Sequence, residues 1–131
     1  MTNNEHASLK LLLALDAATC AAMGAVLLLG STPIARVTEI PVGLLFWAGA
    51  ILIPIAAFMG ISSRTTPVPV WTAALIVLGN LLWLVASIFL PVAGLIAPNA
   101  LGWAFLVGQA GVVAILVKLE FDALRGHAIV A

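Results

Sequence analysis

Four long apolar stretches, separated by short polar or proline-containing breaks, most constrain what this chain can fold into. They cover residues 9–30, 41–61, 68–90 and 99–117. A helix needs about 20 apolar residues to cross a hydrocarbon core of roughly 30 Å, whereas a strand of a membrane barrel needs about 9–11. Backbone groups in hydrocarbon must be paired, and stretches this long favour pairing within helices. The sequence therefore predicts one all-α membrane domain, a four-transmembrane-helix bundle with short connections.

The composition also indicates that the chain is surrounded by lipid rather than water. Of 131 residues, 64% are hydrophobic and only 8% are charged, whereas a soluble domain carries about 25% charged residues. The formal net charge is zero, from five basic and five acidic residues. Nucleic acids are bound through clustered Lys and Arg, so no nucleic-acid partner is expected. The expected surroundings are a lipid bilayer.

The basic residues near the ends of the stretches predict an orientation. If the four stretches alternate in direction, one side of the membrane carries Lys10, Arg64, Lys118 and Arg125. The other side carries Arg36 alone. Since basic residues concentrate on the cytoplasmic side, both termini are predicted to be cytoplasmic. Beyond the fourth stretch, Lys118, Asp122 and Arg125 recur at helical spacing, which predicts an exposed ladder of opposite charges.

Three polar side chains inside the stretches are candidate functional residues. Asp16 lies roughly 6 Å to the cytoplasmic side of the midplane, at a rise of 1.5 Å per residue. An acidic residue near the centre of a span costs about 2.5–3.5 kcal/mol on insertion scales, so such a residue suggests a function. Asn80 and Gln109 fall close to the middle of the third and fourth stretches. If these faces converge, Asp16, Asn80 and Gln109 form an intramembrane polar cluster.

Small residues at spacings of three or four predict where helices pack most tightly, because they let backbones approach each other. The first and fourth stretches carry such residues at Ala14, Ala18, Ala22, Ala104, Gly108 and Gly111. The tightest contact is therefore expected to involve these two stretches, either within the bundle or with a partner.

No motif for catalysis or cofactor binding is present. The sequence contains no glycine-rich phosphate loop, HExxH helix or CxxC pair. Cys20 is the only cysteine, and His6 and His127 lie in the two termini without companion ligands. No metal site, cofactor or enzymatic activity is therefore predicted.

Four short motifs carry a resemblance to known proteins. They are Leu15-Asp16-Ala17-Ala18, Trp47-Ala48-Gly49, Gly79-Asn80-Leu81-Leu82-Trp83 and Gln109-Ala110. These runs resemble small four-helix bacterial inner-membrane proteins of uncharacterised function, which implies a fold and an inner-membrane location but no activity. The chain is also similar to the small multidrug-resistance transporters in size, span count and an acidic residue in the first span. It departs from them because their acidic residue is Glu and their substrate sites include tyrosine, which this sequence lacks.

Two functions remain open from the sequence. The first is a non-enzymatic accessory or interaction protein of the inner membrane, which forms a homo-oligomer or binds another membrane protein. In this case Asp16, Asn80 and Gln109 act as a hydrogen-bonded clasp, of the kind that averages about 0.6 kcal/mol per bond in one membrane protein. The second is a small proton-coupled transporter or channel that uses Asp16 as its protonatable group.

Overall fold

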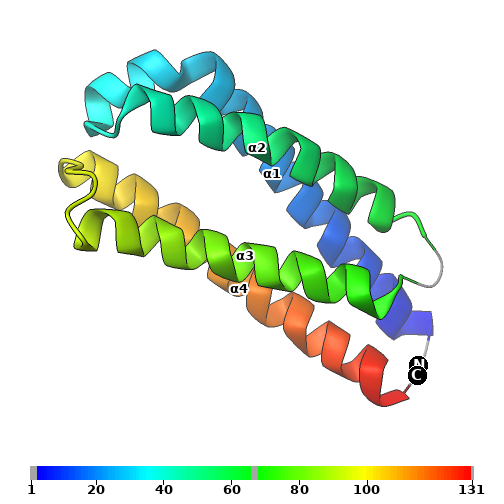
Figure 1. The fold of residues 1–131 in the computed structure, drawn as a ribbon. Helices are drawn as coiled ribbons and strands as arrows, with labels where there is room; N and C mark the ends of the chain where they lie inside the picture. The colour runs from blue at the N-terminus through cyan, green and yellow to red at the C-terminus, as the bar shows by residue number, and fades with distance from the viewer. Residues whose placement is uncertain (1–2, 66–67, 131) are drawn as a thin grey trace.

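The chain folds into an antiparallel bundle of four helices. The computed structural model describes residues 3–65 and 68–130, with side chains from 8–65 and 68–125. The helices are α1 (Asn3–Thr38), α2 (Val42–Ser62), α3 (Val70–Val92) and α4 (Ala100–Val130). Each contains a segment long and apolar enough to span a membrane, which confirms the predicted fold class of a multi-pass membrane protein. The start of α1 and the end of α4 lie at the same end of the bundle (Figure 1); their cytoplasmic location stays a prediction.

The first helix continues beyond the expected end of its span. The sequence predicts a break at residues 30–33, but α1 bends there and runs on to Thr38. Gly30 takes a non-helical conformation with φ −112° and ψ 15°. Pro33 then lies in the first turn of the continuing segment, where a missing backbone N–H removes no helical hydrogen bond. The glycine and the proline therefore produce a kink rather than an end.

The last helix is also longer than its predicted span. α4 continues past residue 117 to Val130. The predicted ladder of charges lies on this extension, where Lys118 Nζ and Asp122 Oδ2 form an exposed ion pair at 3.1 Å. The Arg125 guanidinium lies 5.9 Å from the centre of the Phe121 ring, within the range of a cation–π contact. The extension has an inward face as well, and this face carries Glu120.

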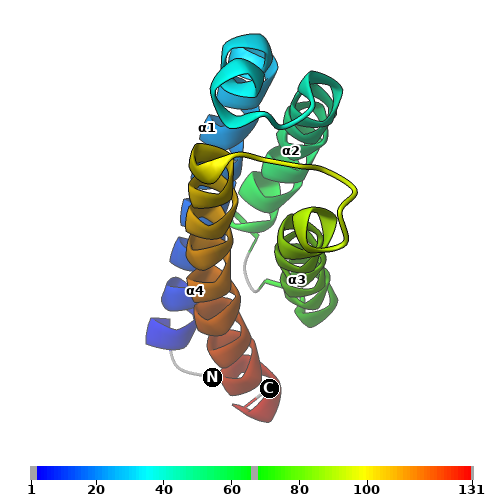
Figure 2. The same ribbon diagram turned by 90° about the vertical axis from the view of Figure 1, so that its left-hand side faces the viewer.

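The four helices pack as two hairpins. The α1–α2 and α3–α4 pairs are in extensive contact, and α1 joins the hairpins by packing on α4. The ribbons of α2 and α3 run apart from each other (Figures 1 and 2). One apolar cluster, around Leu13 and Met59, lies at the end that holds the start of α1 and the end of α4. A second cluster, around Leu27 and Leu45, fills the opposite end, so the middle of the bundle is left for polar groups and a cavity.

Backbones approach each other closely at two places: between α1 and α2 at Gly49, and between the end of α1 and the start of α4, where Gly102 lies against the Thr38 carbonyl. A Cβ atom added at Gly49 would lie 2.8 Å from the backbone oxygen of Gly24 and 2.9 Å from the backbone nitrogen of Leu28. The small residues predicted to make the tightest contact are exposed instead: Ala14, Ala18, Ala22, Ala104, Gly108 and Gly111. Helices α1 and α4 do pack on each other, but not closely through these residues; their contact with a partner stays a prediction.

Helical geometry explains this difference. Residues two positions apart on a helix point to nearly opposite sides, because each residue turns the chain by about 100°. Asp16 is buried and points toward the bundle interior, so Ala14 and Ala18 must point outward. Gly111 points away from the interior in the same way, because it lies two positions after Gln109, which faces inward. The inward direction of Asp16 and Gln109 therefore turns Ala14, Ala18 and Gly111 out of the bundle.

The start of α4 is fixed to the end of α1 by one asparagine. Asn99 Oδ1 accepts a hydrogen bond from the Gly102 backbone N–H at 2.9 Å, and its Nδ2 donates to the Val37 carbonyl at 2.9 Å. The Asn99 backbone N–H also donates to the Thr38 carbonyl at 3.1 Å. Asn99 is thus both the N-cap of α4 and a bridge between helices.

Replacing this asparagine should weaken the bundle moderately. For Asn99→Ala we expect the free energy of unfolding to fall by about 1–2 kcal/mol, since a lost N-cap alone costs about 1 kcal/mol. Denaturation of the purified protein in detergent, followed by far-UV circular dichroism, measures the change. Asn99→Asp keeps the capping oxygen and loses only the donor to Val37, so its loss should be smaller. Equal losses in the two variants would contradict the capping role.

Candidate functional site

Two carboxyl groups and one amide form a buried polar cluster in the bundle interior. Asn80 Nδ2 donates to Asp16 Oδ2 at 2.6 Å and to Glu120 Oε1 at 2.9 Å. Asp16 is 2% exposed and Glu120 is 1% exposed. The Cys20 thiol lies 3.6 Å from Asp16 Oδ1, in a geometry that makes it a weak donor. Three helices are therefore linked through one side-chain amide, and we call Asp16, Asn80 and Glu120 the carboxyl cluster.

The periodicity of each helix places these residues on its inner face. On α1, Leu9, Leu13 and Asp16 follow at spacings of four and three, and the two leucines are buried in the apolar cluster at that end of the bundle. The same spacing rule puts Gln109 and Glu120, which are eleven residues apart, on one face of α4. Burial of these apolar faces thus carries the carboxyl groups into the interior.

The hydrogen bonds within the cluster are unequal for the two acids. Asn80 uses both hydrogens of its amide, one for each carboxyl group. Asp16 accepts from donors at both of its oxygens, whereas Glu120 Oε2 is buried without a hydrogen-bond partner among the described residues. A buried oxygen without a donor destabilises an anion more than a neutral acid. A single proton held by Glu120, with the negative charge on Asp16, therefore satisfies this arrangement best.

Gln109 belongs to a different group of side chains. Trp83 Nε1 donates to Gln109 Oε1 at 2.8 Å, and Gln109 Nε2 donates to Ser87 Oγ at 2.6 Å. Ser87 in turn donates to the backbone carbonyl of Trp83 at 2.7 Å. Of the three residues expected in one cluster, Asp16 and Asn80 are thus joined, while Gln109 is bonded to the α3 residues one and two turns farther along. We call Trp83, Ser87 and Gln109 the tryptophan cluster.

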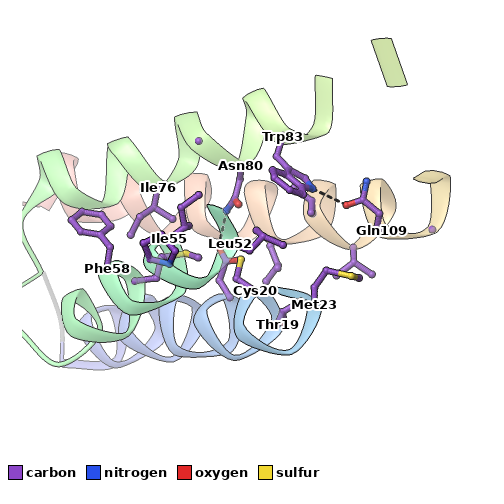
Figure 3. Close-up of a pocket in the computed structure, with 18 of the residues that line it drawn as sticks. Thr19, Cys20, Met23, Leu52, Ile55, Phe58, Ile76, Asn80, Trp83 and Gln109 are labelled. Carbon is purple, nitrogen blue, oxygen red and sulfur yellow. Dashed lines mark hydrogen bonds between the residues drawn. The ribbon is translucent and has the colours of Figure 1, made fainter. Parts of the chain in front are cut away.

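A cavity of about 700 Å³ lies between the hairpins, and residues of both clusters line its wall. Asn80 projects from α3 toward α1, and Trp83 projects toward Gln109 (Figure 3). Asp16 also lines the cavity, whereas Glu120 lies behind it. The α2 wall is wholly apolar, formed by Leu52, Pro54, Ile55, Phe58 and Met59. Ligand sites are typically apolar cavities of about 300–1,000 Å³ with a few polar groups, and this cavity fits that description.

A second cavity of about 230 Å³ continues toward the opposite end of the bundle. Four residues line both cavities: Met23, Trp83, Phe105 and Gln109. The hydrogen bond between Trp83 and Gln109 therefore lies at the junction of the two spaces. The carboxyl cluster borders only the larger cavity.

Sequence reasoning missed Glu120, which ended up outside the predicted fourth span. It lies between Lys118 and Asp122 of the expected charge ladder and was not named as a candidate. The available signal was its spacing of eleven residues from Gln109, three full helical turns. If the helix continues past residue 117, Glu120 lies on the same face as Gln109 and points inward. Helix α4 does continue.

Metal binding finds no support in the geometry. Within the part of the chain that the structure describes, no three or more His, Cys, Asp and Glu residues are grouped to hold a metal ion. The side chains of His6 and His127 lie outside that part.

No family model matches this chain, and neither does any curated protein or solved structure. The resemblance to bacterial inner-membrane proteins and the expected lack of enzymatic activity stay predictions.

Proposed function

We propose that this protein is a small proton-coupled transporter of the bacterial inner membrane that uses Asp16 as its protonatable group. The observation that carries the proposal is that Asp16, paired with Glu120 through Asn80, lies on the wall of the 700 Å³ cavity. Ionisable groups inside membrane domains commonly mark proton or solute pathways. Here the acid has both a proton-sharing neighbour and a space for a solute.

The direction of the polar groups argues against one form of the accessory role. A clasp between subunits needs polar side chains on the outer surface, but Asp16 and Asn80 are buried within one chain; a clasp at the bundle centre is compatible with their hydrogen bond. The cavities favour transport, because the two spaces follow each other along the bundle and share Trp83 and Gln109. An accessory protein has no evident need for two such spaces.

The proton-coupling test uses proteoliposomes that contain a pH indicator. Solutes from a panel are added outside, and the wild-type protein is expected to release internal protons in response to one of them. In Asp16→Asn the protein should still fold, because an amide retains hydrogen bonding to neighbouring groups, but proton release should fall to the level of protein-free vesicles. The matched control is Asp122→Asn, which removes an exposed acid of α4 and should transport normally.

Two outcomes would contradict this function. Proton release at the wild-type rate in Asp16→Asn would show that Asp16 is not the coupling group. Absence of release for every solute, together with a stoichiometric membrane protein that co-purifies with both wild type and Asp16→Asn, would instead support the accessory role.

A further inference from the structure

We propose that the larger cavity binds a neutral, lipid-soluble molecule through a hydroxyl group that donates a hydrogen bond to Asp16, beside the free side-chain oxygen of Asn80. This ligand class deepens the proposed transport function and rests on it only for its biological use. Direct binding and transport are separate measurements, so one can fail without the other. Two features of the cavity define the ligand: the hydrogen-bonding capacity left on its wall, and the surroundings of its opening.

The donors that α3 and α4 bring to the cavity wall are already used within the protein. Asn80 donates both amide hydrogens within the carboxyl cluster, and Trp83 donates its N–H within the tryptophan cluster. Gln109 Nε2 donates to Ser87 Oγ at 2.6 Å and to the Leu106 carbonyl at 3.3 Å. An amide nitrogen carries two hydrogens and an indole nitrogen carries one, so these three side chains have no hydrogen left for a ligand.

The donors of α1 are used in the same way. The Thr19 hydroxyl donates to the Leu15 carbonyl at 2.8 Å, and the Cys20 thiol points to Asp16 Oδ1. The α2 wall is apolar. Among the side chains that the structure describes on this wall, a ligand with acceptors only, such as an ether or a ketone, therefore finds no free donor.

Acceptors stay available at the carboxyl cluster. Asn80 is 9% exposed and lines the cavity, and no side chain or backbone group of the described residues donates to its Oδ1, since its hydrogen bonds are both made by Nδ2. Asp16 accepts one hydrogen bond at each oxygen, whereas a carboxylate has about four acceptor positions. Both residues lie on the wall within hydrogen-bond distance of each other. A surplus of acceptors without free donors is complementary to a ligand that donates.

The opening indicates that the donor is a neutral group. The cavity reaches the surface between α2 and α3, where the lining residues Ile55, Phe58 and Leu75 are exposed. These helices are membrane-spanning segments, so this side of the cavity faces hydrocarbon, where a full charge is costly. A quaternary cation also has no hydrogen to donate to the free acceptors. A hydroxyl group on an apolar body meets both requirements.

Two glycines give a way to fill the cavity without disturbing the packing. Gly79 and Gly108 line the cavity, and a Cβ atom added at either meets nothing within 4 Å. A leucine at either position should therefore occupy ligand space and leave the helix contacts intact. Gly111 lies one turn from Gly108 and is equally free of neighbours, but it does not line the cavity. Gly111→Leu is thus the matched control.

The test measures binding of three probes to the protein in nanodiscs by equilibrium dialysis, with empty nanodiscs subtracted. The probes are β-naphthol, its methyl ether, which has the same ring without the donor, and the naphthyltrimethylammonium cation. We expect saturable binding of β-naphthol, and binding of the ether and of the cation that is weaker by about 10-fold or more, the loss of one hydrogen bond to a charged group.

The variants locate the bound hydroxyl. Asp16→Asn should weaken β-naphthol and narrow its advantage over the ether, because the new amide brings a donor to the cluster in place of an acceptor. Gly108→Leu should weaken β-naphthol as well, and Gly111→Leu should not.

Each other outcome overturns the inference. These outcomes are no saturable binding of β-naphthol, equal binding of its ether, tighter binding of the cation, or an unchanged preference for the hydroxyl in Asp16→Asn. Unchanged affinity in a folded Gly108→Leu variant would place the ligand outside the cavity, and Gly79→Leu replaces it if Gly108→Leu does not fold. Selective binding of β-naphthol without proton release in proteoliposomes would retain this inference and refute the transport function.

Discussion

Replacing Asn80 with leucine should lower the free energy of unfolding by about 3 kcal/mol or more, the cost of leaving two buried carboxyl groups without their hydrogen-bond donor. Asn80 supplies hydrogen bonds to both Asp16 and Glu120, and a leucine of similar size supplies neither. Denaturation of the purified variant in detergent at neutral pH measures the loss. The neighbouring Leu81→Ala, which truncates a side chain that is 40% exposed, is the control and should be close to neutral.

A double variant gives a sharper test. In Asn80→Leu the buried Asp16 side chain lacks its amide donor, and Asp16→Asn replaces the acid with a neutral amide. Adding Asp16→Asn to Asn80→Leu should therefore restore part of the stability. A loss that Asp16→Asn leaves unchanged would show that Asn80 acts through packing alone.

Replacing Gly49 with alanine should destabilise the protein by about 2 kcal/mol, within the range observed for overpacked sites. The added methyl group would lie 2.8 Å from the Gly24 oxygen and 2.9 Å from the Leu28 nitrogen. Both atoms belong to the backbone, so relief requires α1 and α2 to separate. Thermal unfolding in detergent, monitored by circular dichroism, measures the effect.

The matched control for Gly49 lies on the same helix. A Cβ atom at Gly43, in the first turn of α2, meets nothing within 4 Å. Gly43→Ala should therefore be neutral or stabilising, because alanine favours the helical conformation by up to about 1 kcal/mol. Equal effects at the two positions would contradict the close packing at Gly49 and indicate a general response of α2 to alanine.

Much of the architecture could be predicted from apolar length alone. Hydrophobic stretches of about 20 residues leave few alternatives to spanning helices, so the fold class needed no tertiary information. The bend at Gly30 could not be predicted in the same way. Gly followed closely by Pro is typical both of a helix end and of a kink. Which of the two forms depends on whether the residues after the proline can pack as a helix against the rest of the bundle.

The candidate site was only partly predictable for a geometric reason. Depth in the membrane follows from counting residues, and it correctly identified Asp16 and Asn80 as residues that can meet. Which way each helix faces does not follow from depth. Rotation of α4 directs Gln109 to Trp83 and Ser87, and it brings Glu120 to Asn80. The small residues of α1 were misassigned for the same reason, since burial of Asp16 turns Ala14 and Ala18 outward.

The arrangement of the hairpins has a mechanical consequence. Because α1 and α4 provide the main contact between the hairpins while α2 and α3 run apart, the α1–α4 contact is a natural hinge axis. Rotation of one hairpin about this axis changes the width of the cavity and leaves the Gly24–Gly49 packing within the other hairpin unaltered. Asn80 is on α3 and Asp16 is on α1, so their hydrogen bond links one hairpin to the other away from this axis. Without that bond, the packing of α1 on α4 is the main link between the two hairpins.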